Sequence, residues 1–164
     1  MAAFALTSCY VAVGTAWTGT APGGTTTPSG TITTPTDCSG FVTAVSMEFT
    51  SDELDTTGFT SGGYRSKITG LATGTCTLTI NQDFAASQGD AVFGLGGTTG
   101  WAPGQSSPYF IDIRATNAAR GATNPSFVAA WVSTSYQPLA GSVGDLATIT
   151  LNLPLVGRIG RLTS

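Results

Sequence analysis

The side chains that could carry out catalysis are few, and histidine is absent from the chain. Histidine is the usual general base at neutral pH and a common zinc ligand. Composition therefore excludes Ser-His-Asp and Cys-His catalysis and any histidine-ligated metal. An enzyme would need a carboxylate pair instead, and no spacing of Asp and Glu favours one pair over another. We expect no enzymatic activity and no cofactor.

The densest group of carboxylates is Asp52, Glu53 and Asp55. These oxygens could contact Ca²⁺, but their spacing matches no EF-hand loop and the central glycine is missing. The segment DTTG at 55–58 is similar to an aspartic-protease loop, with one residue too many and no second copy. We interpret the group as the solvated end of a strand.

A glycine-rich run, GLGGTTG at 94–100, is the other segment that could hold a ligand. Its spacing is neither GxGxxG nor that of a P-loop, and no lysine follows it. We interpret it as a plain loop.

Three cysteines, Cys9, Cys38 and Cys76, lie far apart and lack the CxxC spacing of a zinc or redox site. We expect all three to be buried as small apolar side chains. A Cys9–Cys38 disulfide is the alternative.

Composition points to a neutral surface rich in hydroxyl groups. Charged residues make up 9% of the chain and the net charge is −3, whereas Thr, Gly and Ser number 29, 22 and 15. A protein that binds nucleic acid tightly normally has a basic patch. The six Lys and Arg of this chain are scattered instead, which argues against tight DNA binding. The tryptophans, Trp17, Trp101 and Trp131, could form a stacking platform for a sugar or a base, but we interpret them as packing residues.

Length and hydropathy place the chain among single-domain proteins. A chain of 164 residues favours one domain, 1–164. No run reaches the ~18 apolar residues that a membrane span needs. A signal peptide needs a basic amino-terminal region, but the first charged residue is Asp37. We therefore expect no membrane association and no secretion.

The first half of the chain predicts three strands separated by two long loops. Residues 4–13 are a β-prone apolar run, and 14–37 combine ten Thr with three Pro and several Gly, which predicts an extended loop or arm. Residues 40–50 alternate, and 75–81 do so most clearly. Residues 56–70 between them predict a long hairpin loop. The apolar face of the strand at 40–50 consists of Phe41, Val45, Met47 and Phe49.

The second half predicts one short helix and three more strands. The helix falls within 83–95, with Asp90 as its cap. Strands are expected at 109–115, 127–136 and 145–153, followed by a tail after Pro154. Short strands separated by turn signals predict an all-β fold, an antiparallel sandwich or barrel with one short helix.

Three segments resemble phage tail tube proteins of the siphophage type over roughly residues 37–153. They are DCSGFVTAVSMEFTSDELDTTGF, TINQDFAASQGDAVFGL, and FIDIRATNAARGATNPSFVAAWVSTSYQPLAGSVGDLATITLNL. The resemblance implies a structural virion protein whose six-membered rings stack into the tail tube that delivers genome DNA. It implies assembly in the host cytoplasm, and contacts with the tape-measure protein and with tail terminator and initiator proteins. It also implies that the long loops contact neighbouring subunits and rings.

Two sets of residues are candidates for these roles. The polar faces of the strands are the candidates for the channel lining. A ring of six copies would carry a net charge of −18, and this charge would repel DNA phosphate. The lumen candidates are Glu48, Thr77, Thr79, Asp112, Arg114, Thr148 and Thr150. The candidates for contacts between subunits and rings are Leu54, Phe59, Tyr64, Arg65, Lys67 and Ile68.

Two other functions fit the same composition. One is a tail terminator or capsid decoration protein, which forms rings or binds a lattice without stacking into tubes. The other is a carbohydrate-binding, adhesin-type β module, which would present exposed aromatic side chains. Both share the predicted all-β fold.

Overall fold

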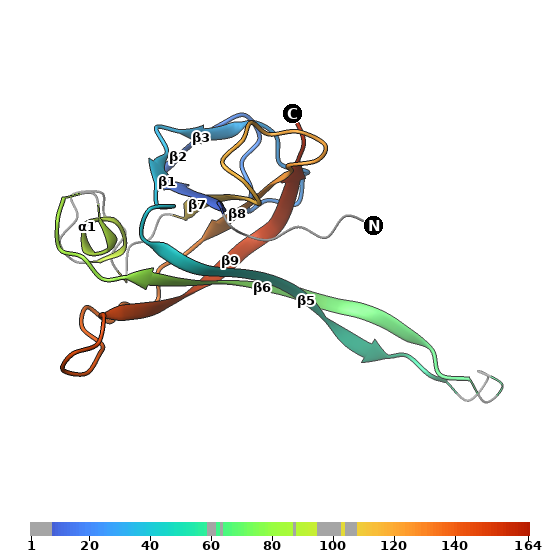
Figure 1. Ribbon diagram of the computed structural model, residues 1–164. Helices are drawn as coiled ribbons and strands as arrows, with labels where there is room; N and C mark the ends of the chain where they lie inside the picture. Colours follow the sequence, from blue (N-terminus) through green and yellow to red (C-terminus); the bar gives the residue numbers. More distant parts are fainter. Residues whose placement is uncertain (1–7, 59–61, 63, 87, 95–102, 104–107) are drawn as a thin grey trace.

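The computed structural model describes residues 8–58, 62, 64–86, 88–94, 103 and 108–164. Within these residues it confirms an all-β fold with one short helix (Figure 1). No helix in the described part of the chain is long and apolar enough to cross a membrane. The elements are β1 (Tyr10–Gly14), β2 (Ala16–Thr18), β3 (Thr31–Thr33), β4 (Thr36–Asp37), β5 (Val42–Asp55), β6 (Lys67–Asn81), α1 (Gly89–Phe93), β7 (Tyr109–Arg114), β8 (Ser126–Trp131) and β9 (Thr148–Leu162).

One antiparallel sheet of seven strands, in the order β4-β1-β7-β8-β9-β6-β5, forms the body. The long strand β9 lets this sheet fold over on itself. Its first half pairs with β6, and its second half, from Leu155 to Leu162, pairs with β8. Near the start of the second half, where the register with β8 is irregular, Gly157 adopts a φ of 68° against the backbone of Gly23, and a Cβ atom there would lie 2.3 Å from the Gly23 oxygen. A glycine is needed here because other residues are strained at this φ.

The core lies between the two layers of this folded sheet, and strict alternation creates it. Cys76, Leu78 and Ile80 of β6 are fully buried, and Ile149, Leu151 and Leu153 of β9 face the same interior. Trp131 is also fully buried, with its ring centroid 4.9 Å from that of Tyr109 and 6.1 Å from that of Phe93 in α1. Each large apolar side chain buried in this way contributes about 1.5–3 kcal/mol.

The segment 14–37, predicted as an extended loop or arm, combines loop with short strands. It contains strands β2 and β3, which pair as a small hairpin, and β4, which pairs with β1. Ile32 packs on Phe110 and Ala130, and the Trp17 ring lies 5.5 Å from the Phe110 ring. The apolar side chains that attach this hairpin to the sheet, Ile32, Trp17 and Ala21, are too few for a periodicity to be visible in the sequence.

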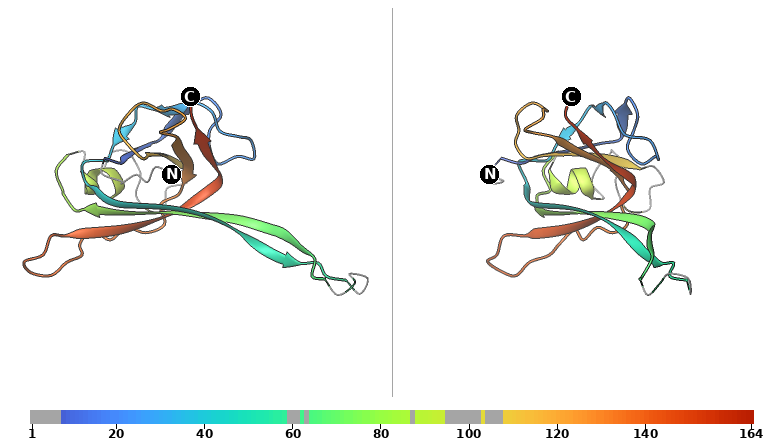
Figure 2. Two further views of the ribbon diagram at one scale, coloured as in Figure 1. Left: turned by 45° about the vertical axis from the view of Figure 1, so that its right-hand side comes forward. Right: turned by 90° about the vertical axis from the view of Figure 1, so that its right-hand side faces the viewer.

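The segment 56–70 is also more regular than expected. Strand β5 continues to Asp55 and β6 begins at Lys67, so the two strands are joined through 56–66. Asp52, Glu53 and Asp55 are exposed at the end of β5, as predicted. A register irregularity falls between Ser51 and Glu53. The two strands leave the body as one long arm (Figure 2). Strands form here without a buried face, and their β-branched residues Thr50, Ile68, Thr69 and Thr73 favour extended backbone.

Several predicted boundaries are wrong at the carboxyl end. Strand β9 begins at Thr148 and runs to Leu162, so the residues after Pro154 are a strand and not a tail. Strand β8 ends at Trp131, short of the predicted 136. Gly157 interrupts the alternation of buried and exposed residues in β9, so the sequence pattern does not indicate the second half of this strand.

The amino-terminal strand and the helix differ in detail from their predictions. Strand β1 begins at Tyr10, and the predicted residues 4–7 lie outside the described residues. The residue before α1 is Gln88, whereas Asp90 lies in the first turn and is not its cap. A carboxylate there still suits the positive end of the helix dipole.

The cysteines are free thiols, so there is no Cys9–Cys38 disulfide; Cys38 and Cys76 are buried as predicted, but Cys9 is only partly buried. Burial raises the pKa of the Cys76 thiol to about 12 and raises that of Cys38 as well. These two side chains therefore act as small core residues.

Candidate assembly surfaces

A polar face covers the three strands β5, β6 and β9 on the side away from the core. The strand register sets Ala44, Thr79 and Thr150 side by side in one row, and the next row contains Thr77 beside Asn152. Thr77 donates a hydrogen bond to Asn152 Oδ1 at 3.3 Å. Five lumen candidates fall on this face, namely Glu48, Thr77, Thr79, Thr148 and Thr150.

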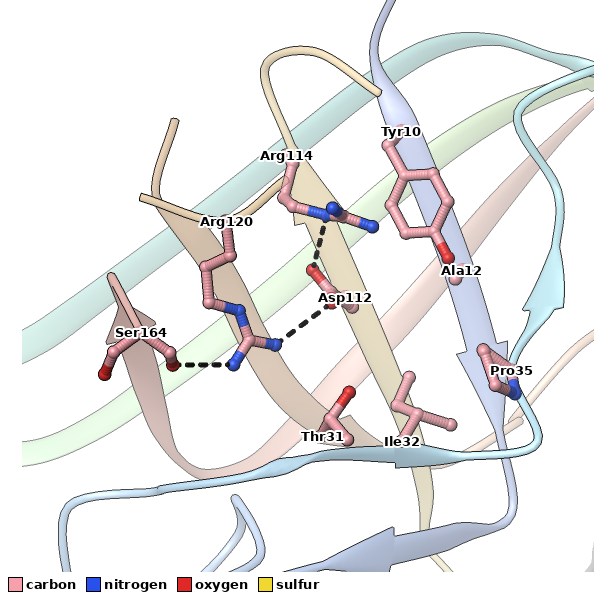
Figure 3. A pocket seen from close by; sticks show the side chains of 9 residues that line it. All are labelled: Tyr10, Ala12, Thr31, Ile32, Pro35, Asp112, Arg114, Arg120 and Ser164. Carbon is pink, nitrogen blue, oxygen red and sulfur yellow. Dashed lines mark hydrogen bonds and ion pairs between the residues drawn. The ribbon is translucent and has the colours of Figure 1, made fainter. Parts of the chain in front are cut away.

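Asp112 and Arg114 do not belong to that face. Both lie on β7, on the side covered by the β2–β3 hairpin, and Asp112 is only 6% exposed (Figure 3). Alternation along β7 correctly separates them from Ile111 and Ile113, but it cannot indicate that another element covers them. A buried carboxylate does not line a channel, and Arg114 lies on the same covered side of β7. We therefore remove both residues from the proposed lining.

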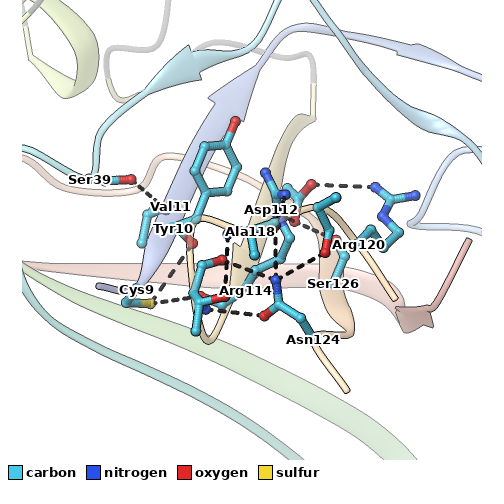
Figure 4. Close-up of polar contacts among 12 residues, drawn as sticks. Cys9, Tyr10, Val11, Ser39, Asp112, Arg114, Ala118, Arg120, Asn124 and Ser126 are labelled. Carbon is cyan, nitrogen blue, oxygen red and sulfur yellow. Dashed lines mark hydrogen bonds and ion pairs between the residues drawn. The ribbon is translucent and has the colours of Figure 1, made fainter. Parts of the chain in front are cut away.

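Asp112 is instead the centre of a buried ion-pair cluster. Its two carboxylate oxygens lie 3.4 Å from Arg120 Nη2 and 3.7 Å from Arg114 Nε. The Ser126 hydroxyl donates a further hydrogen bond to it. The Arg114 guanidinium also stacks over the Tyr10 ring at 3.7 Å (Figure 4). We call Asp112, Arg114, Arg120 and Ser126 the aspartate cluster.

Arg120 is the member of this cluster that sequence reasoning missed. It lies in the loop between β7 and β8, and its Nη1 donates to the Gly30 carbonyl at 2.9 Å and to the Ser164 carbonyl at 3.2 Å. One side chain thus joins the hairpin loop, β7 and the end of β9. The loop that carries Arg120 is held by Asn124, whose buried side chain donates hydrogen bonds to the Thr116 and Ala118 carbonyls. Nothing in the sequence pattern around Arg120 itself indicates its role.

The arm carries most of the candidates for subunit contacts. Leu54 and Ile68 are direct cross-strand partners, about half exposed, and Tyr64 near the tip is 82% exposed. Lys67 forms an ion pair with Glu53 at 2.5 Å, and Arg65 is exposed. Phe59 lies outside the described residues. Apolar side chains clustered on an exposed surface are typical of a contact site.

Two long strand edges have no partner among the described residues. Strand β5 is the last strand of the sheet, and β9 pairs on one side only from Thr148 to Leu153. Open edges present unpaired backbone groups that can add another strand. They bound the polar face on both sides.

No family model and no curated protein matches the sequence. Solved structures do match the fold. One is a chain of the structure described as "Tail of empty GTA particle computed with helical refinement, C6 symmetry", with a TM-score of 0.51, 16% identity, and coverage of 76% of this chain and 83% of that one. Another is a chain of the "Virion of native gene transfer agent (GTA) particle", with a TM-score of 0.49, 15% identity, and coverage of 74% and 84%. At this identity the first likeness shows a shared fold.

Proposed function

We propose that this protein is a structural subunit of a phage-type tail, and that six copies form rings that stack into a tube for DNA. The observation that carries the proposal is the polar face of β5, β6 and β9, bounded by two open strand edges. The shared fold with a chain from a C6-symmetric tail supports it.

Ring closure would join the β5 edge of one copy to the β9 edge of the next. Six three-stranded segments then form one closed sheet, which leaves no edge open to aggregation. The polar face becomes the inner wall, and the core and the β2–β3 hairpin lie outside it. Isolated subunits keep both edges exposed, which favours assembly.

The chemistry of the polar face suits the passage of DNA. Its register rows consist mainly of Thr, Ser and Asn, and Glu48 is their charged member. Binding of DNA rests on Lys and Arg contacts to phosphate. A wall of hydroxyl groups with one carboxylate per subunit repels the phosphates weakly and lets the DNA slide.

The remaining parts of the proposal follow from the same role. The arm contacts neighbouring subunits or rings through Leu54, Tyr64 and Ile68. The tape-measure protein occupies the tube before DNA does, and terminator and initiator proteins bind its ends. The subunit is made in the host cytoplasm and ends in the virion.

Electron microscopy of the purified protein at increasing concentration tests this proposal. We expect rings with sixfold symmetry that stack into tubes with a central channel. Rings that never stack would favour a terminator or decoration protein instead. A monomer at all concentrations, also in the presence of a tail initiator complex, would contradict the proposal.

Changing Glu48 to Lys is expected to leave assembly intact and make the tubes retain DNA. The side chain is exposed and takes part in no core contact, so folding should not change. Six new cations per ring would contact phosphate, and binding should weaken steeply as salt increases. Retention of labelled duplex DNA on pelleted tubes measures the effect. Glu48→Gln is the control and should retain little; equal retention by both variants and the wild type would place Glu48 outside the channel.

A further inference from the structure

An apolar groove of ≈320 Å³ opens at the end of the body from which the arm leaves. Phe49 and Phe127 at this groove are 48% and 38% exposed. Val45, Met47 and Ile159 are partly buried and pack against the core beneath it. The side chains that line the groove include Cys9, Val45, Met47, Ile113, Phe127 and Ile159. Open apolar grooves of this kind are typical of contact sites.

The loop between β8 and β9 presents apolar side chains at the opposite end of the body. Leu139 and Leu146 are each 69% exposed, and Val143 is fully exposed. This loop follows Trp131, whereas the groove lies at the Ile113 and Phe127 ends of β7 and β8. Figure 1 shows the loop and the arm pointing away from each other.

The base of this loop is anchored to the body. Gln82 donates to the Pro138 carbonyl at 3.0 Å and to the Tyr136 hydroxyl at 2.9 Å, and that hydroxyl donates to Asp90 at 2.9 Å. A turn closes where the Asp145 amide donates to the Ser142 carbonyl. The apolar side chains are therefore presented on a supported loop, which lowers the entropy lost when they bind.

The two ends also carry opposite charges. Among the described residues of 82–94 and 132–147, which lie at the loop end, the charged ones are all acidic: Asp83, Asp90 and Asp145. At the groove, the exposed Arg161 is the cross-strand partner of Phe127, whereas the Arg114 guanidinium is paired with Asp112 on the other face of β7. Complementary charges fix orientation and register between two surfaces.

We propose that the β8–β9 loop of one copy inserts its apolar side chains into the groove of a second copy, with Asp145 opposite Arg161. This inference deepens the proposed function, since the second copy belongs to the next ring. The contact joins two different surfaces and so repeats without closing, as a stack of rings requires. Each contact is small, but six of them act together between two rings and reinforce one another.

Charge reversal tests the pairing. Arg161→Glu and Asp145→Lys are each expected to raise the protein concentration needed for stacking at least tenfold, while single rings still form. The two changes combined in one chain should restore stacking to within about threefold of the wild type, because attraction between opposite charges returns. Arg158→Glu is the matched control, since this exposed arginine of β9 does not line the groove, and it should assemble like the wild type.

Two results would overturn the inference and leave the proposed function standing. They are tubes formed normally by both single variants, and a double variant no better than either one. A loss of stacking in Arg158→Glu equal to that in Arg161→Glu would also overturn it, because the effect would then be one of general charge.

A cross-link gives an answer even where tubes do not form. Cys9 is a free thiol that lines the groove, and a Val143→Cys variant would place a second thiol on the loop. Oxidation of concentrated protein with diamide removes two hydrogens and should link these thiols between copies. We expect a ladder of multimers that disappears when Cys9→Ser is added. A ladder that persists without Cys9, or no ladder, would contradict the loop-to-groove contact.

Discussion

Replacing Asp112 with alanine is expected to lower the free energy of unfolding by about 3–5 kcal/mol, because breaking a buried ion pair leaves uncompensated charge. The Arg114 and Arg120 side chains are only 15% and 16% exposed, and Asp112 is the carboxylate that both contact. The Ser126 hydroxyl would lose its acceptor as well. Urea unfolding followed by circular dichroism measures the loss.

The control for this prediction is the exposed ion pair on the arm. Glu53 and Lys67 are 65% and 44% exposed, and such surface pairs contribute about 0–1 kcal/mol. Glu53→Ala should therefore change the free energy of unfolding little. A loss in Asp112→Ala no larger than in Glu53→Ala would show that water compensates the arginines, and that the aspartate cluster does not hold the hairpin and β9 together.

Periodicity predicts the strands that build the core and misses those that do not. Cys76, Leu78 and Ile80 alternate with threonines, so β6 could be located from the sequence and its buried face named. The outer half of the same strand has no buried face, and nothing in its pattern distinguishes it from a loop. The second half of β9 was missed for a different reason, because Gly157 breaks the alternation.

The sequence also predicts part of which strand faces are exposed and polar. Glu48, Thr77 and Thr150 could be placed on one surface because neighbouring strands pair in register. Asp112 was assigned wrongly, since alternation gives the face of a strand but not what covers that face. The covering hairpin depends on Ile32 and Trp17, too few apolar residues to reveal it in the sequence.

Removal of the arm is expected to abolish tube formation and leave a folded subunit. Ser51 and Ala72 are cross-strand partners, so residues 52–71 can be replaced by Asn-Gly, which favours a tight two-residue hairpin turn. The described residues lost are at least partly exposed, and none belongs to the core. The shortened chain should therefore unfold in urea close to the wild-type midpoint while electron microscopy shows no tubes.

The apolar pair on the arm should account for much of that loss. Leu54→Ser combined with Ile68→Ser keeps the length of the arm but removes its directly paired apolar side chains, and we expect it to assemble poorly. Glu53→Gln combined with Lys67→Gln removes the exposed ion pair instead and should assemble normally, because such pairs contribute little. Tubes formed by the shortened chain at the wild-type concentration would show that the arm makes no contact between rings, and that stacking depends on the groove and the β8–β9 loop alone.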